Sequence, residues 1–173
     1  MVIDLGIPVS HFDSHQNLHV LPGIVRVTDE LAKEHGIPAV RFPRERLRTY
    51  MLRQRGAVSR KYGAVSRILQ SLVLAFFCQL GRKRLSSLRT DHCVGFFYGG
   101  ILNKKNLLNV LRHLPLTGTC ELTCHPGFND PDPRFTQWDY HHEDELEALT
   151  DPEIRDFLIE RNVELISHRQ FAT

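Results

Sequence analysis

Short apolar stretches alternate with helical patterns along most of the chain, and this alternation limits the folds that the chain can adopt. The strand-like stretches are followed by segments with helical apolar spacing, capping residues and glycine stops. We expect strands within residues 7–13, 37–43, 93–99, 118–127 and 163–168, and helices within residues 22–36, 44–60, 63–81, 103–115, 143–150 and 151–162. Repeated strand–helix units predict an α/β fold, in which helices cover a parallel sheet.

The composition is that of a globular protein, and we expect a single domain over residues 1–173. Hydrophobic residues make up 42% of the chain, which is enough for a buried core. The formal net charge of +2 gives no electrostatic reason to expect a nucleic-acid partner. The most apolar run, Ile68 to Leu80, is too short for a membrane span, which needs about 20 residues.

The cysteines and the N-terminal sequence favour a cytoplasmic protein. None of the four cysteines forms a CxxC pair, and we expect reduced, buried thiols. The first residues are neither basic nor followed by a long apolar core, so they do not resemble a signal peptide.

The segment "SHFDSHQNLHVLP", Ser10 to Pro22, concentrates polar side chains at the end of the first expected strand. In parallel α/β folds, this is where sites form. Asp13, His15 and His19 offer one carboxylate and two imidazoles, a ligand set for zinc or a similar divalent ion. On a helix, the four-residue spacing would put both rings on one face. Alternatively, the histidines cap the next helix or fill polar corners, and Asp13 accepts backbone N–H bonds in a loop.

His125 lies at the end of a later expected strand, in the sequence "HPG". It either points into the crevice at this edge of the sheet or lies in an exposed turn.

Several segments together resemble the YdjC-like carbohydrate deacetylases, a family that includes chitooligosaccharide deacetylase and a relative from hopanoid biosynthesis. The stretch "HFDSHQNLHVLPGI" is similar to the family's "DSHxHxH" motif. In the same order follow "VRFPRE", "GFFYGGILNKKNLLNVLRHLP", "ELTCHPGFND" and "DELEALTDPEIRDFLIERNVELISH". The resemblance therefore extends over nearly the whole chain, and its most specific parts are the first stretch and "CHPG".

The resemblance implies a metal-dependent hydrolase on an irregular (β/α) barrel, which removes acetyl groups from N-acetylated amino sugars. The substrate would be such a sugar or a glycolipid head group, and the cofactor a divalent ion, magnesium or zinc. By the same resemblance, His15 is a metal ligand with His19 close by, and Asp13 orients the ligand. His125 would donate a proton to the leaving amine or stabilise the tetrahedral intermediate. Arg41 and Tyr98 are expected to contact the substrate.

The chain also departs from the family pattern. It has neither the family's "DDFG" motif nor its earlier histidine motif, and Asn17 replaces the middle histidine of "DSHxHxH". A full barrel needs roughly 250 residues, so we expect a partial barrel whose N-terminal βα units are missing. Two hypotheses follow. One is a deacetylase that is incomplete or weak in this chain, and the other is a non-catalytic remnant or interaction module of the same fold. The exposed edges of a partial barrel would favour homo-oligomers.

Overall fold

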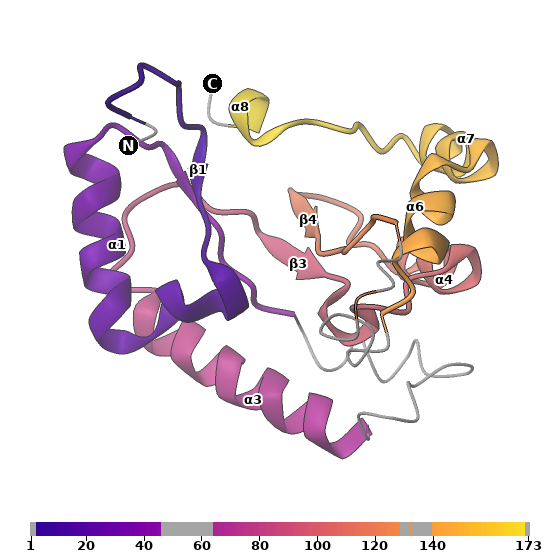
Figure 1. Ribbon diagram of the computed structural model, residues 1–173, viewed down its shortest axis with the longest axis horizontal. Coiled ribbons are helices and arrows are strands. Elements are labelled where there is room, and N and C mark those ends of the chain that lie inside the picture. The colour runs from indigo at the N-terminus through magenta and orange to yellow at the C-terminus, as the bar shows by residue number, and fades with distance from the viewer. Residues whose placement is uncertain (1–2, 46–63, 129–131, 133–139, 172–173) are drawn as a thin grey trace.

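The computed structural model describes residues 3–45, 64–128, 132 and 140–171, with side chains from Ile68 onward in the second range (Figure 1). The helix expected within residues 44–60 lies almost wholly outside the described residues. Within the described part of the chain, no helix is long and apolar enough to cross a membrane.

The N-terminal part of the structure is built on two parallel strands, β1 (His11–Phe12) and β2 (Ala39–Val40). Between them run the 3-10 helix η1 (His15–Val20) and the helix α1 (Pro22–Glu34). Pro22 suits the first turn of α1, because the backbone N–H that proline lacks would have no partner there. Leu88 makes an isolated parallel bridge to Ala39 on β2.

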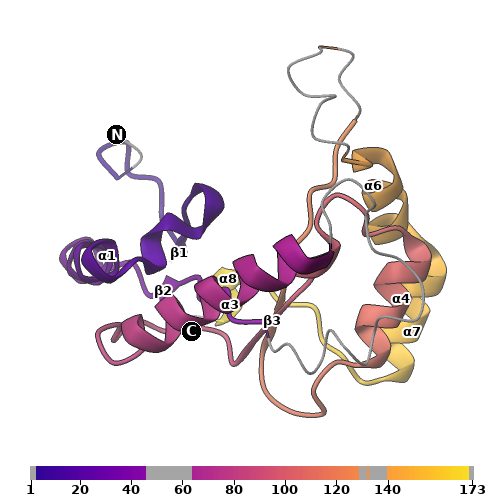
Figure 2. The ribbon, with the colours of Figure 1, turned by 90° about the horizontal axis from the view of Figure 1, so that it is seen from below.

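The long helix α3 (Ala64–Gly81) closes the core of this part by packing against α1 and η1. The core consists of buried apolar residues from these elements and their connections: Val20, Val25, Ala32, Ile37, Val40, Phe42, Cys78 and Leu85. The view in Figure 2 shows α3 running along the outside of the molecule.

The second part of the structure holds a parallel pair of strands, β3 (His92–Val94) and β4 (Cys120–Leu122), in which Cys93 aligns with Glu121. Its helices are η2 (Phe96–Tyr98), α4 (Lys104–Arg112), α6 (His142–Thr150) and α7 (Pro152–Glu160). The Asn103 side chain caps α4 and the Asp151 side chain caps α7, each by accepting a backbone N–H. A second core lies between these helices and strands, with Leu102, Leu107 and Val110 at its centre.

The C-terminal segment returns from α7 to the N-terminal part and ends in the short helix α8 (His168–Phe171) (Figure 1). The strand predicted within residues 163–168 is not formed, because the backbone of residues 163–167 pairs with no described strand. Leu165, whose apolar character favoured a strand, is 75% exposed.

The predicted α/β class with parallel strands is confirmed, but a barrel is not. The described strands form two separate two-stranded sheets, β1 with β2 and β3 with β4. The polar residues of the candidate site follow β1, β2 and β4, except Glu121, which lies within β4.

Candidate active site at the carboxyl ends of the strands

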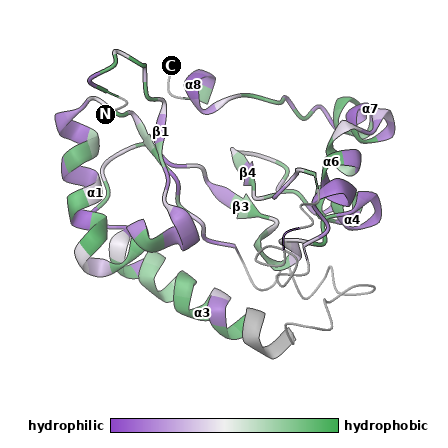
Figure 3. Cartoon of the chain, viewed as in Figure 1, coloured by the Kyte–Doolittle hydropathy of each residue, from purple (hydrophilic) through white to green (hydrophobic). Residues whose placement is uncertain are grey.

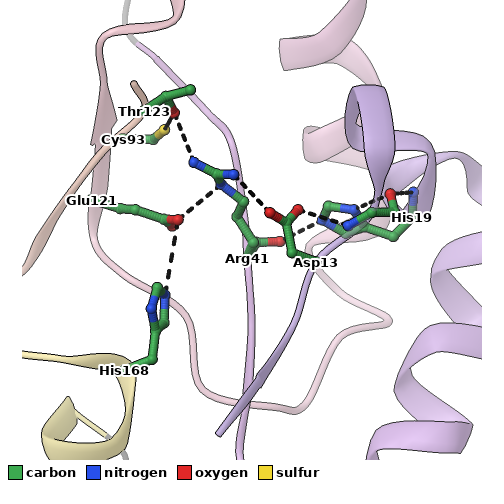
Figure 4. A network of polar contacts seen from close by, with 8 residues as sticks. Asp13, His19, Arg41, Cys93, Glu121, Thr123 and His168 are labelled. Atoms are coloured by element: carbon green, nitrogen blue, oxygen red, sulfur yellow. Dashed lines mark hydrogen bonds and ion pairs between the residues drawn. The ribbon is translucent and has the colours of Figure 1, made fainter. Parts of the chain in front are cut away.

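Arg41 joins the two parts of the structure at the ends of their strands (Figure 4). Its backbone N–H donates to the Phe12 carbonyl at 3.0 Å, which fixes it beside β1. Its Nη1 donates to Asp13 Oδ2 at 2.7 Å, and its Nη2 donates to Thr123 Oγ1 at 2.9 Å. Nε lies 2.8 Å from Glu121 Oε1 in an ion pair. We call Asp13, Arg41, Glu121 and Thr123 the strand-end cluster.

The strand-end cluster places one guanidinium between two carboxylates. The Glu121 side chain is 11% exposed, and burial raises its pKa, with a contribution from Asp13, against the lowering effect of Arg41 and His11. Burial alone would lower the pKa of Arg41, but Glu121 and Asp13 raise it, so the guanidinium stays charged. Arg41 is therefore committed to protein partners, and it positions Asp13. The expected contact of Arg41 with substrate stays a prediction, and each of its three guanidinium nitrogens already contacts a protein group.

A pair of stacked histidines lies beside the strand-end cluster. The rings of His11 and His168 are 3.9 Å apart at an interplanar angle of 13°. His168 Nε2 is also 3.9 Å from Glu121 Oε1. Burial lowers the pKa of both histidines; His168 lowers that of His11 further, and Arg41 lowers that of His168. The stack attaches α8 to the start of β1.

His19 has a structural role in this arrangement. It is 1% exposed, and its Nε2–H donates to the Arg41 carbonyl at 2.7 Å. Its Nδ1 then accepts from the Ser14 hydroxyl at 2.8 Å, while the His19 backbone N–H donates to Ser14 Oγ. Burial lowers its pKa, which favours the neutral ring. Both ring nitrogens already have protein partners, so His19 offers none to the metal site predicted for it.

His15, the other predicted metal ligand, is exposed. It does not share a face with His19, because η1 is irregular: Gln16 and Asn17 have φ values of 55° and 59°. Asparagine adopts this left-handed conformation more readily than most residues. The geometry expected from a helical HxxxH pair is therefore not formed, and His15 is an exposed residue two positions after Asp13.

His125 is partly buried at the end of β4 and is held by α6 on both sides of its peptide unit. Its backbone N–H donates to Glu145 Oε2 at 2.5 Å, and its carbonyl accepts from His142 Nδ1 at 2.6 Å. Its ring packs edge-on against Tyr140 at 5.1 Å. The sequence left open whether His125 points into a crevice or lies in an exposed turn. Its partial burial and these contacts do not fit a fully exposed turn.

Tyr98 lies in the core rather than where a sugar could reach it. It is 2% exposed, and its hydroxyl accepts from Asn109 Nδ2 at 3.3 Å. The predicted substrate contact does not match this position, because the ring packs among the buried residues beneath α4.

Sequence reasoning missed Glu121, Thr123 and Glu145. Alternation along "ELTCHPG" places Glu121 and Thr123 on one face of an extended chain, and this signal could have identified them. Glu145 has a weaker signal, an acidic residue near the start of a helix. It is fully buried, and its carboxylate accepts from the backbone N–H groups of Leu102 and His125.

The described residues do not form a complete metal site by themselves. No group of three or more histidine, cysteine, aspartate or glutamate side chains among them is arranged to hold an ion. His15 fits as one ligand, since its ring is exposed, whereas His19 does not. All four cysteines are free thiols; Cys78 and Cys93 are buried as expected, but Cys120 is exposed.

Short parallel strands with a polar cluster at their carboxyl ends define an α/β protein with a candidate enzymatic site. The family model described as "YdjC-like protein" matches residues 1–160, and the chain belongs to this family.

The chain is similar to curated deacetylases at low identity. It is 25% identical to a carbohydrate deacetylase from Clostridium beijerinckii, covering 96% of this chain and 55% of that protein. It is 28% identical to a carbohydrate deacetylase from Mus musculus, covering 93% of this chain and 55% of the relative. It is also 28% identical to a chitooligosaccharide deacetylase from Yersinia enterocolitica, covering 87% of this chain and 48% of the relative.

One solved structure shares the fold. It is the crystal structure of a protein from Enterococcus faecalis V583 whose name refers to cellobiose-phosphate cleavage. The TM-score is 0.62 and the sequence identity is 21%. The match covers 99% of this chain and 56% of that one. The chain thus spans about half the length of the relatives that it matches.

Proposed function

We propose that the chain supplies one side of a carbohydrate deacetylase site, which removes acetyl groups from N-acetylated amino sugars. The family supports this class of reaction. The observation that carries the proposal is the position of Asp13, which Arg41 fixes directly after β1, two residues before the exposed His15. Sites of parallel α/β proteins lie at this edge.

Asp13 has the geometry of a fixed but accessible carboxylate. Its Oδ1 accepts from the Ser14 backbone N–H at 2.7 Å and its Oδ2 from Arg41, so the group cannot turn freely. The side chain is nevertheless 34% exposed. A carboxylate oxygen has further lone pairs, so Asp13 can accept a bond from a bound sugar, a water molecule or the His15 ring.

We propose that His125 acts on the leaving amine or on the tetrahedral intermediate. The contacts with Glu145 and His142 fix its backbone, so the ring keeps a defined position beside Tyr140. A histidine held in this way can donate a proton to the departing amine or a hydrogen bond to the tetrahedral oxyanion.

His15 would hold a divalent ion, magnesium or zinc, together with ligands from outside the described residues. When bound, the ion would lower the pKa of a water molecule toward neutrality. Asp13 would orient the His15 ring for this role.

The proposal can be tested in a chimera that has the full length of a family member. Residues 1–173 replace the matched portion of the Clostridium beijerinckii relative, and acetate release from N-acetylglucosamine oligomers is measured with added magnesium or zinc. We expect release, and a loss of about 10- to 100-fold for Asp13→Asn. A folded, metal-loaded chimera without acetate release would refute the proposal.

The second candidate is a non-catalytic module of the same fold. It is favoured by the lack, among the described residues, of a group of three ligands for an ion. Under this hypothesis, the chimera folds but releases no acetate, and His15→Ala leaves its metal affinity unchanged.

A further inference from the structure

Two consecutive glycines, Gly99 and Gly100, lie against the rings of His125 and Tyr140. A Cβ atom at position 99 would lie 3.3 Å from His125 Cε1 and 3.7 Å from its Nδ1. A Cβ atom at position 100 would lie only 2.5 Å from Tyr140 Cδ1. The two rings also contact each other, with their centroids 5.1 Å apart. Each glycine therefore leaves the space that one of the two rings occupies.

The backbone explains the glycine at position 100 but not the glycine at position 99. Gly100 has a φ of 81°, a left-handed conformation that favours glycine by itself. Gly99 has a φ of −53° and a ψ of 125°, which other residues adopt without strain. The Phe96 carbonyl oxygen would lie at an ordinary 3.5 Å from a Cβ atom at position 99. Among the described residues, the imidazole of His125 is what a side chain at this position would meet first.

The contact between Gly99 and His125 is steric. Residues 95–102, "GFFYGGIL", contain no charged side chain, and this segment between β3 and α4 is largely apolar (Figure 3). The segment therefore limits where the imidazole can lie, and it brings no charged side chain of its own to the ring.

The backbone of His125 is already fixed, so the ring can move only by rotation about its side-chain bonds. The backbone N–H donates to Glu145 and the carbonyl accepts from His142 Nδ1. Two side-chain torsions then remain to place the imidazole. Gly99 limits them at Cε1, the carbon between the two ring nitrogens, and the Tyr140 ring limits them through its edge-on contact.

We propose that Gly99 is a positioning residue for His125, because the lack of a side chain at this position lets the nitrogen-bearing edge of the imidazole lie where the reaction needs it. This inference rests on the proposed function, in which the ring acts on the leaving amine or on the tetrahedral intermediate. A methyl group at position 99 would displace the ring by a few tenths of an ångström. A misplacement of about 1 Å can cost about 100-fold in rate, so we expect a loss of about 3- to 10-fold for Gly99→Ala.

Nuclear magnetic resonance of the isotope-labelled whole chain tests the contact without any need for activity. The ring signals of His125 are assigned by their loss in His125→Asn. We expect nuclear Overhauser effects from His125 Hε1 to the Gly99 Hα protons and to the Tyr140 ring. Gly99→Ala should shift the Hε1 signal, whereas Gly23→Ala should not, since a Cβ atom at position 23 would meet nothing within 4 Å. A chain without the effect between His125 and Gly99 would overturn the proposal, even if the chimera releases acetate.

Kinetics of the chimera test the role of Gly99 in the reaction. Gly99→Ala should lower kcat and leave KM within about twofold, because it changes the chemical step rather than substrate binding. Its melting temperature and that of Gly23→Ala should stay close to the parent's, and Gly23→Ala should keep the parent's kcat. Gly99→Ala combined with His125→Ala should cost no more than His125→Ala alone, because the ring through which Gly99 acts is gone.

Two kinetic results would overturn the proposal: a Gly99→Ala chimera as fast as the parent, or an equal loss from Gly99→Ala with and without the His125 imidazole. A folded, metal-loaded parent chimera that releases no acetate would refute the proposed function instead. The resonance measurement would then still decide whether Gly99 fixes the ring.

Discussion

Arg41 shows how one residue can set the geometry of the whole candidate site. Its guanidinium contacts Asp13 after β1, Glu121 within β4 and Thr123 after β4. A lysine side chain has a single ammonium group and cannot make all three contacts in this geometry. We expect Arg41→Lys to lower the free energy of unfolding by about 1–3 kcal/mol, because Glu121 remains buried with a poorer partner. Urea unfolding measures this, with the exposed Arg155→Lys as control; equal stability of the two variants would contradict the positioning role.

His15 and His19 permit a paired test at the residue scale. His19→Ala removes a buried ring that is bonded at both nitrogens, and should cost about 2–4 kcal/mol of stability without changing zinc affinity. His15→Ala should leave stability within about 0.5 kcal/mol, because the ring is exposed, but should weaken zinc binding. Urea unfolding of both variants checks the stabilities, and calorimetric titration with zinc of the chimera that carries each substitution checks the affinities. The reverse pattern would restore His19 as the ligand.

At the same scale, the sequence identifies the polar stretch after β1 but not the role of each histidine. The HxxxH spacing assumes regular helix, and the left-handed backbone at Gln16 and Asn17 removes that assumption. The fixed role of Arg41 could not be predicted either, because its partners Glu121 in β4 and Thr123 directly after β4 are far away in the sequence, Thr123 at a separation of 82.

At the scale of elements, Glu145 connects the start of α6 to the segment that carries His125. Glu145→Ala would leave the backbone N–H groups of Leu102 and His125 buried without this acceptor. We expect a loss of about 2–5 kcal/mol in the free energy of unfolding. Glu147→Ala, at an exposed position of the same helix, should have little effect on chemical unfolding. If the two variants unfold alike, Glu145 does not organise this loop.

Local patterns predicted most elements, and the one expected strand that is missing has a physical cause. The helix expected within 22–36 is α1, the one within 63–81 is α3, and four expected strands are present in shortened form. Capping residues and glycine stops act locally, so the sequence reveals them. A strand also needs a partner, which is why the apolar alternation of residues 163–167 did not produce one.

At the scale of the whole molecule, the stacked His11 and His168 make the closure of the chain sensitive to pH. Glu121, Asp13 and Arg41 are the charged groups that act on the stack. Burial lowers the pKa of both histidines and of His19 below the ordinary value of 6.5. Their stabilising contribution is therefore present above pH 6.5 and is lost as the pH falls toward the lowered values.

We expect the melting temperature to drop between pH 7.5 and pH 5.5, and His168→Ala should reduce that drop. Thermal unfolding monitored by circular dichroism checks the effect, with the exposed His35→Ala as control. A drop of the same size in His168→Ala and in the parent would exclude the stack as its source.

Acetate release by the chimera that carries residues 1–173 tests the central claim most directly. If Asp13 and His15 form one side of a deacetylase site, the parent chimera releases acetate from N-acetylglucosamine oligomers, and Asp13→Asn and His15→Ala each reduce the rate about tenfold or more. If a folded chimera releases none, or if both variants work as fast as the parent, then the strand-end cluster is not part of a deacetylase site.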